Sequence, residues 1–180
     1  MSTAVLLPPA CSIGRRAFKQ CRSLTSLSLP VGMVHISESM FAHSKALQTI
    51  TLPTTLVSIG VRAFTGCVGL TALNLPASLV GISAGAFSGC SRLHTLSFSG
   101  GLRSIGAYAF RKCITLTDLH LPDGLLCVGN KAFAGCLGIS TASLPDSLAR
   151  IGECAFDGTV LVTTRVRNIE SGGAELENRT

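Results

Sequence analysis

The string GISAG, from Gly81 to Gly85, is the part of the chain that comes nearest to a catalytic motif. It satisfies G-x-S-x-G, in which a serine on a sharp strand-to-helix turn is the nucleophile of a hydrolase. That chemistry also needs a histidine, an acid and a long helix after the serine. Those partners are missing, and Ser83 stands where equivalent segments carry glycine, as at Gly60 and Gly106. We therefore predict that the protein is not an enzyme.

Cysteine and histidine could act as disulfides or as metal ligands. The chain has 8 cysteines and 4 histidines. Five cysteines share one repeating position, which we call the cysteine column: Cys21, Cys67, Cys90, Cys113 and Cys136. There is no C-x-x-C pair and the histidines follow no common spacing, so we predict neither a metal site nor a cofactor. We expect the column cysteines to be buried, unpaired thiols, because parallel side chains disfavour the disulfide dihedral angle.

The formal net charge of +6 is compatible with binding to an anionic partner. Eight of the 15 basic residues fall into three groups: Arg15, Arg16, Lys19 and Arg22; Arg111 and Lys112; Arg165 and Arg167. These groups do not form one stripe, and only Tyr108 is a candidate for stacking on a base. We favour a solvated edge that keeps the protein soluble over a nucleic-acid surface. The alternative that remains open is binding of nucleic acid or another anionic polymer.

A repeat of 23 residues positions all of these side chains. Seven of the eight phenylalanines follow it without a slip: Phe18, Phe41, Phe64, Phe87, Phe110, Phe133 and Phe156. In most copies an Ile precedes the Phe by five residues, an Ala lies directly before it, and apolar residues follow at six, nine and eleven. A proline usually ends that run. A fixed period in this range is typical of solenoids.

Each unit contains two recognisable segments. The first, as in LTSLSLP from Leu24 to Pro30, alternates apolar and polar residues and then meets a proline, which predicts a short strand. The second, I-G-x-x-A-F-x-x-C, suits one helical or 3-10 turn that is too short to be stable alone. Stacked copies must cover each other. We expect an α/β fold, a right-handed leucine-rich-repeat solenoid of about seven repeats, with a parallel β-sheet on one wall and the helical or 3-10 turns on the other.

We expect one domain, 1–167, whose first and last turns are degenerate, followed by a disordered tail, 168–180. In the last turn, Arg165 and Arg167 occupy positions that should hold leucine. Neither end carries an obvious polar cap. This indicates truncation of a longer chain or end-to-end self-association through the uncapped turns.

The mean hydropathy is high, at +0.49, and no charged residue lies between Arg62 and Arg92. Asn74, Pro76 and five glycines interrupt that stretch, so we predict no membrane span. The N-terminus has no basic leader, so no signal peptide is predicted. The chain as given is expected in the cytoplasm, or at a cell surface if it is a fragment of a longer protein.

The combined pattern L-x-x-L-x-L-P-x-x-L-x-x-I-G-x-x-A-F-x-x-C resembles the BspA-like leucine-rich repeats. The resemblance covers Leu7 to about Val162, and complete copies run from Leu47 to Cys67, from Leu70 to Cys90 and from Leu116 to Cys136. It implies a curved solenoid used as a scaffold for adhesion or protein interaction, frequently at cell surfaces. It implies no catalytic residues.

We therefore predict a non-catalytic protein-interaction or adhesion module whose protein partner is unknown. Alternation along each strand sends the residues eight and ten after the repeat Phe outward. The predicted binding residues on that face are Ser26, Ser28, Thr49, Thr51, Asn74, Thr95, Ser97, Asp118, His120, Thr141 and Ser143. Ser and Thr are also common on solvent-facing strands that bind nothing. The functional hypothesis is a hydrogen-bonding strip, with Asp118 and His120 as its best contact candidates.

Overall fold

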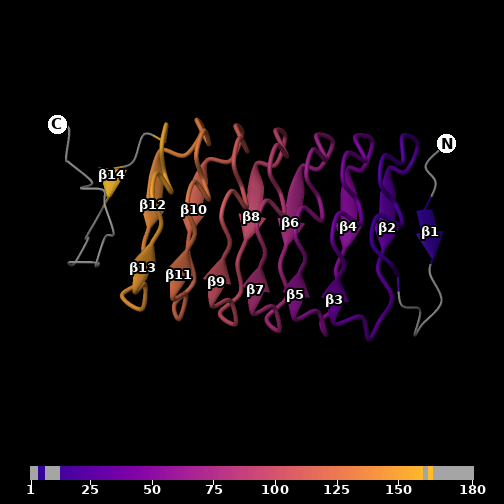
Figure 1. Ribbon diagram of the computed structural model, residues 1–180, viewed down its shortest axis with the longest axis horizontal. Coiled ribbons are helices and arrows are strands. Elements are labelled where there is room, and N and C mark those ends of the chain that lie inside the picture. The colour runs from indigo at the N-terminus through magenta and orange to yellow at the C-terminus, as the bar shows by residue number, and fades with distance from the viewer. Residues whose placement is uncertain (1–3, 7–12, 160–161, 164–180) are drawn as a thin grey trace.

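The structure is a computed structural model that describes residues 4–6, 13–159 and 162–163. Short strands alternate along the chain between two walls, and the strands within each wall are parallel. The described residues form a parallel β-solenoid of about five complete turns, from β2 (Ser26–Ser28) to the start of β12 (Thr141–Ser143). The turns are stacked along the long axis of the molecule (Figure 1).

The first wall holds the strands predicted from the L-x-x-L-x-L segments. Besides β2 and β12 it contains β1 (Ala4–Leu6), β4 (Thr49–Thr51), β6 (Ala72–Asn74), β8 (Thr95–Ser97), β10 (Asp118–His120) and β14 (Val162–Thr163). Their ladders form three groups, β1-β2-β4, β6-β8 and β10-β12-β14. In β2, β6 and β10 the central residue points inward, so Leu27, Leu73 and Leu119 are buried while the flanking positions face out. The predicted strands and their inward face are confirmed.

The second wall is a sheet that the sequence patterns did not predict. Six strands of two residues pair in the order β13-β11-β9-β7-β5-β3. They are β3 (His35–Ile36), β5 (Ser58–Ile59), β7 (Gly81–Ile82), β9 (Ser104–Ile105), β11 (Cys127–Val128) and β13 (Arg150–Ile151). Each ends on the repeat Ile or Val, whose side chain enters the core. A strand of two residues is too short to show an alternating pattern of apolar and polar residues, so the sequence did not predict these strands.

The helical or 3-10 wall is not confirmed, because the described residues there form hydrogen-bonded turns and contain no helix. Phe64 N–H donates to the Ala86 carbonyl of the next turn at 2.7 Å, and Cys67 N–H donates to the Phe64 carbonyl at 3.1 Å. Arg62 and Gly66, with φ of 53° and 70°, flank this phenylalanine. Left-handed residues reverse the helical path of the backbone, so no i to i−4 ladder can form. We call the stacked segments of this kind the turn wall. Alternate amides in them bond to the neighbouring turn, and the amides between them bond to a carbonyl three residues back in the same turn.

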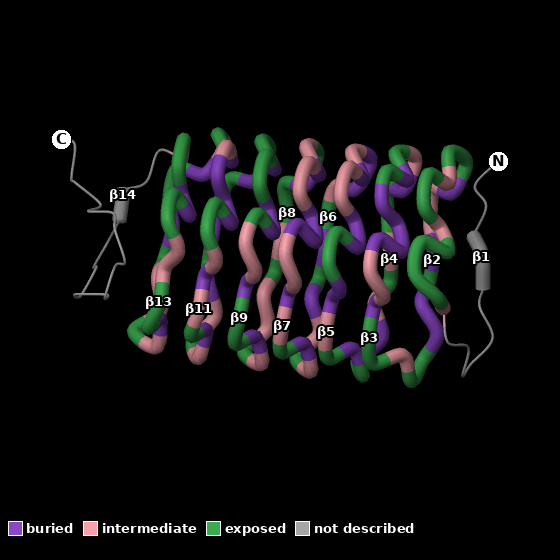
Figure 2. Tube along the Cα trace, in the orientation of Figure 1, coloured by how far each residue is buried: buried purple, intermediate pink, exposed green. Residues whose placement is uncertain are grey.

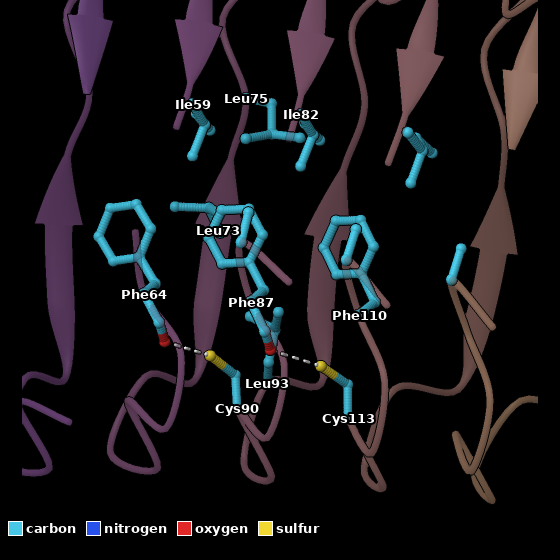
Figure 3. Packing of buried hydrophobic residues seen from close by; sticks show 14 of the residues in the cluster. Ile59, Phe64, Leu73, Leu75, Ile82, Phe87, Cys90, Leu93, Phe110 and Cys113 are labelled. Carbon is cyan, nitrogen blue, oxygen red and sulfur yellow. Dashed lines mark hydrogen bonds between the residues drawn. The ribbon is translucent and has the colours of Figure 1, made fainter. Parts of the chain in front are cut away.

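The core is one stack of nearly identical layers. Figure 3 shows Phe64, Phe87 and Phe110 in a row, one from each of three successive turns, and their ring centroids are 5.1 Å and 5.2 Å apart with nearly parallel planes. This spacing follows from the separation of about 4.8 Å between neighbouring strands. The buried residues line the inside of every described turn (Figure 2). Each layer is therefore covered by the next one, as the repeat predicts.

Several predictions concern residues outside the described ranges. The first and last repeats extend there, so the count of seven repeats is not confirmed, and the right-handed sense stays a prediction. Arg165, Arg167 and the tail 168–180 lie there as well. Within the part of the chain that is described, no helix has the length and apolar character needed to cross a bilayer.

Candidate functional site

The predicted binding residues lie together on the outer side of the first wall, and we call this surface the sheet-face strip. It consists of Ser26, Ser28, Thr49, Thr51, Asn74, Thr95, Ser97, Asp118, His120, Thr141 and Ser143, all exposed except the half-buried Ser26. Parallel pairing aligns them in register, with Ser28 opposite Thr51 and His120 opposite Ser143. The strip is therefore two columns of small polar side chains that run across the strands, a geometry suited to hydrogen bonding.

Asp118 and His120 differ from the hydroxyl side chains around them. The Asp118 carboxylate accepts hydrogen bonds from Thr117 Oγ1 at 3.2 Å and from Thr141 Oγ1 at 3.4 Å. Both donors lie at the surface, so the carboxylate is oriented but still exposed and has lone pairs left for a partner. His120 is exposed on the same face of β10. The strip thus offers a charged acceptor and an imidazole side by side, which can recognise a polar partner.

Ser83 of the GISAG string occupies a position of the repeat and not a catalytic elbow. Its N–H donates to the Ile59 carbonyl at 2.9 Å, as Gly106 N–H donates to the Ile82 carbonyl at 2.8 Å one turn later. Ser83 is half-buried, and hydrogen-bonded turns follow it where the elbow requires a helix. The motif is therefore accounted for by the repeat.

The cysteine column lies inside the turn wall. The Cys90 thiol donates to the Phe64 carbonyl of the preceding turn at 3.2 Å, and the Cys113 thiol donates to the Phe87 carbonyl at 3.3 Å (Figure 3). Both thiols are free and fully buried. Burial raises the pKa of Cys67 from 9.0 to about 12, and it also raises the pKa of Cys90 well above its ordinary value. The described residues contain no group of three or more His, Cys, Asp or Glu placed to hold a metal ion.

A basic cavity at the N-terminal end of the turn wall was missed by the sequence predictions. It has a volume of about 380 Å³ and is lined by Gln20, Arg22, His43 and Lys45. Only Arg22 belonged to a predicted basic group. The signal was nevertheless present, because Lys45 follows Arg22, and His43 follows Gln20, by one repeat. Residues one repeat apart become neighbours on adjacent turns.

The other basic residues do not join this cavity. Arg15 pairs with Glu38 at 3.3 Å on the surface. Arg111 and Lys112 lie four repeats further along the chain, where the Arg111 guanidinium is 6.0 Å from the Tyr108 ring, at the outer range of a cation–π contact. None of these three basic residues lines the cavity.

Comparison with solved structures supports the fold. A leucine-rich repeat protein of T. pallidum is 31% identical and superimposes with a TM-score of 0.82, over 87% of this chain and 76% of that one. A leucine-rich repeat protein from Bacteroides ovatus is 25% identical with a TM-score of 0.75, over 88% of this chain and 50% of that one. One from Eubacterium ventriosum is 27% identical with a TM-score of 0.78, and the match covers 88% of this chain and 42% of that one. The chain thus spans half or less of the last two proteins.

The sequence itself is also similar to a known family. No protein of curated function matches the chain. The profile of the BspA type leucine rich repeat region matches with six copies, over residues 11–125 and 103–172. The matched segments include nearly all of the described solenoid. The chain therefore belongs to the BspA type leucine-rich repeat family.

Proposed function

We propose that this protein is a non-catalytic interaction or adhesion module that binds a protein partner through the sheet-face strip. The observation that carries the proposal is the alignment of exposed polar residues in two columns across β2, β4, β6, β8, β10 and β12. Six strands at about 4.8 Å spacing give the strip a length of roughly 24 Å, enough for an extended contact. The finer expectations, a right-handed coil of about seven turns and a role in adhesion, belong to the same proposal.

The strip is suited to binding because its side chains and backbone lose little conformational freedom when a partner binds. Ser, Thr and Asn side chains are short, and they stand on strands that are each paired in register with at least one neighbouring strand. Short side chains on a rigid support lose little conformational entropy on association. Their hydroxyl and amide groups provide both donors and acceptors. Recognition through this surface would therefore depend on hydrogen bonds and shape more than on charge.

A crosslinking experiment tests which surface meets the partner. A photoactivatable residue is placed at Asn74, in the middle of the strip, or at Arg111 on the turn wall, and the full chain is exposed to an extract of its native source. Both positions are exposed. We expect one and the same protein to be captured from Asn74 and not from Arg111. Capture from Arg111 alone would contradict the proposal.

The second candidate function is binding of an anionic polymer, and the basic cavity favours it. Contacts to phosphate groups release counterions, so such binding weakens steeply as the salt concentration rises. Binding to the strip should change little between 50 and 200 mM salt, because most strip residues are uncharged. The salt dependence of the affinity therefore separates the two candidates. A loss of on the order of 10³-fold over this range would favour the anionic polymer.

A further inference from the structure

The basic cavity lies where the turn-wall segments of two adjacent turns run side by side. Gln20 N–H donates to the Ala42 carbonyl at 2.9 Å, which holds the first segment against the second. The His43 N–H in turn donates to the Thr65 carbonyl at 2.7 Å, which holds the second segment against a third. The backbones that carry the lining side chains are therefore fixed relative to each other.

Ser44 strengthens this support from beneath the cavity. It takes the place of cysteine in the column, and it is fully buried. Its hydroxyl donates to the Phe18 carbonyl and accepts from the Cys21 N–H at 3.1 Å. A hydroxyl is a stronger donor and acceptor than a thiol. The two turns that form the cavity are thus joined by two side-chain hydrogen bonds in addition to the backbone ladder, so its walls are in place before a ligand binds.

The lining has the chemistry of an oxyanion site. Arg22 and Lys45 contribute two positive charges from equivalent positions of adjacent turns, and none of the described residues that line the cavity is acidic. Two like charges on neighbouring turns repel each other unless an anion lies between them. Gln20 and His43 can add hydrogen bonds that orient a ligand. A guanidinium fork and an ammonium group together are well suited to phosphate or sulfate oxygens.

This cavity is not a general product of the repeat. In later turns the position of Gln20 and His43 is mostly glycine, as at Gly66 and Gly89, and the position of Arg22 and Lys45 is uncharged: Val68, Ser91, Ile114 and Leu137. Gln20 and His43 also keep positive φ values of 58° and 61°. Side chains in this left-handed region carry backbone strain that glycine would avoid. Lys112, at the same position of a later turn, has a φ of 60° as well, so it is the pairing of this position with Arg22 and Lys45 that is particular to the first two turns.

Gly66 is what leaves room for the His43 ring. A Cβ on Gly66 would lie 2.5 Å from His43 Nδ1 and 3.1 Å from its Cε1. Any side chain at this position would push the imidazole out of its place in the cavity wall. The next glycine of the series, Gly89, has no such neighbour, and the nearest atom to its Cβ would be 3.9 Å away in Gly66.

We infer that this cavity is a binding site for a phosphate or sulfate group, bound by Arg22 and Lys45 and oriented by Gln20 and His43. The site lies on the turn wall, away from the sheet-face strip, and goes beyond the proposed interaction function. The same chemistry fits a free ion or the phosphate of a larger molecule. The probes are therefore inorganic phosphate and glucose 6-phosphate, each titrated against sodium chloride of equal ionic strength.

The first comparison tests whether phosphate binding depends on the two charges at the cavity or only on the net charge of the protein. The Arg22→Gln/Lys45→Gln double variant removes two positive charges from the turn wall at the cavity. The control, Arg111→Gln/Lys112→Gln, removes two positive charges from the turn wall at a distance from it. NMR titration of backbone amides should show tenfold or greater weakening of phosphate binding in the first variant and less than twofold in the control. If both variants weaken binding equally, the field of the whole protein explains it and the site is rejected. Tighter binding of glucose 6-phosphate would indicate that the site takes the phosphate of a larger molecule, and tighter binding of inorganic phosphate would indicate a free ion.

The second comparison leaves the charge untouched. Gly66→Ala and Gly89→Ala carry similar backbone strain, since their φ values are 70° and 74°, but only Gly66→Ala displaces the His43 ring. We expect weaker phosphate binding in Gly66→Ala alone, while both variants fold with similar stability. The inference is overturned if the two variants bind as the unaltered protein does, or if neither probe binds that protein.

Discussion

Buried thiols have a hydrogen-bonding role in this repeat that an aliphatic side chain could not perform. The Phe64 carbonyl accepts the Cys67 N–H within its own turn at 3.1 Å and the Cys90 thiol of the next turn at 3.2 Å. Both lone pairs of a buried carbonyl are thereby used. Ser44 performs the same task two turns earlier with a hydroxyl that donates to the Phe18 carbonyl. The cysteine column is therefore explained by packing and by the need to pair these carbonyls.

Three thiols of this column, those of Cys67, Cys90 and Cys113, should be almost unreactive in the folded protein. Cys67, Cys90 and Cys113 are fully buried, whereas Cys154 is exposed. The thiolate is the reactive form, and burial raises the pKa of Cys67 and Cys90. After air exposure, mass spectrometry should find the three buried cysteines unpaired and slow to alkylate, with Cys154 labelled first. A reproducible disulfide between two of the three would refute this prediction.

The raised pKa of Cys67 also makes stability depend on alkaline pH. The unfolded chain releases the thiol proton near pH 9.0, while the folded protein keeps it until about pH 12. The unfolded state therefore binds fewer protons in this window, and the free energy of unfolding falls as pH rises through it. Cys67→Ser should remove a share of that slope, on the order of 1 kcal/mol per pH unit. Urea titrations between pH 8 and 11 would measure it, and identical slopes would contradict the assignment.

At the scale of the elements, each turn is stabilised mainly by the layers above and below it. Phe87 has a ring neighbour on either side, at 5.1 Å and 5.2 Å, and is fully buried. Phe156 has Phe133 at 5.3 Å on one side and retains 6% exposure. An inner layer cannot relax into a cavity without disturbing both of its neighbours. The stability of a turn should therefore depend on its place in the stack.

Truncation of an inner and an outer phenylalanine tests this dependence. Phe87→Ala should lower the free energy of unfolding by about 3–5 kcal/mol, because it leaves a cavity in a packed layer. Phe156→Ala should cost clearly less, because the end layer can relax. Chemical denaturation of both variants gives the comparison. Equal losses at the two positions would be incompatible with a stack of mutually supporting layers.

The turn wall depends on left-handed residues at fixed positions, and Gly89 is a clean place to test this. Its φ is 74°, and an added Cβ would meet only ordinary contacts. Gly89→Ala should therefore destabilise the protein by about 1–2 kcal/mol through backbone strain alone. Gly100 has neither a positive φ nor any atom within 4 Å of an added Cβ. Gly100→Ala should leave the free energy of unfolding unchanged or raise it by about 0.4–1 kcal/mol. A similar loss in both variants would speak against the role of left-handed geometry.

The sequence predicted those parts of the fold that the hydrophobic period controls. Leu73 and its equivalents identified the first wall, its inward face and the stacking of copies, and the polar strip followed from alternation. The turn wall could not be predicted, because Arg62, Tyr108 and Lys131 adopt left-handed backbones that their residue types do not signal. The basic cavity was missed for a related reason. His43 gains its role from residues one turn away, which become neighbours only when the register of the turns is known.

At the scale of the whole molecule, the solenoid presents different chemistry on different sides. The sheet-face strip carries small polar groups along its whole described length, while the turn wall carries a basic cavity at its N-terminal end and the Arg111–Lys112 pair further along. A stack of near-identical layers therefore supports surfaces that vary from turn to turn without altering the core. Our two proposals therefore place two chemically distinct ligands at two separate places on one scaffold.

The most direct test of the proposed function compares partner affinity in two double variants. Asp118→Ala/His120→Ala alters the strip, and Arg111→Ala/Lys112→Ala alters the turn wall at nearly the same level of the stack. All four side chains are exposed, so both variants should melt within a few degrees of the unaltered protein. For the partner captured through Asn74, we predict that the strip variant binds at least tenfold more weakly and that the turn-wall variant binds normally. Normal binding by the strip variant, together with loss of binding in the turn-wall variant, would show that the opposite wall is the binding surface.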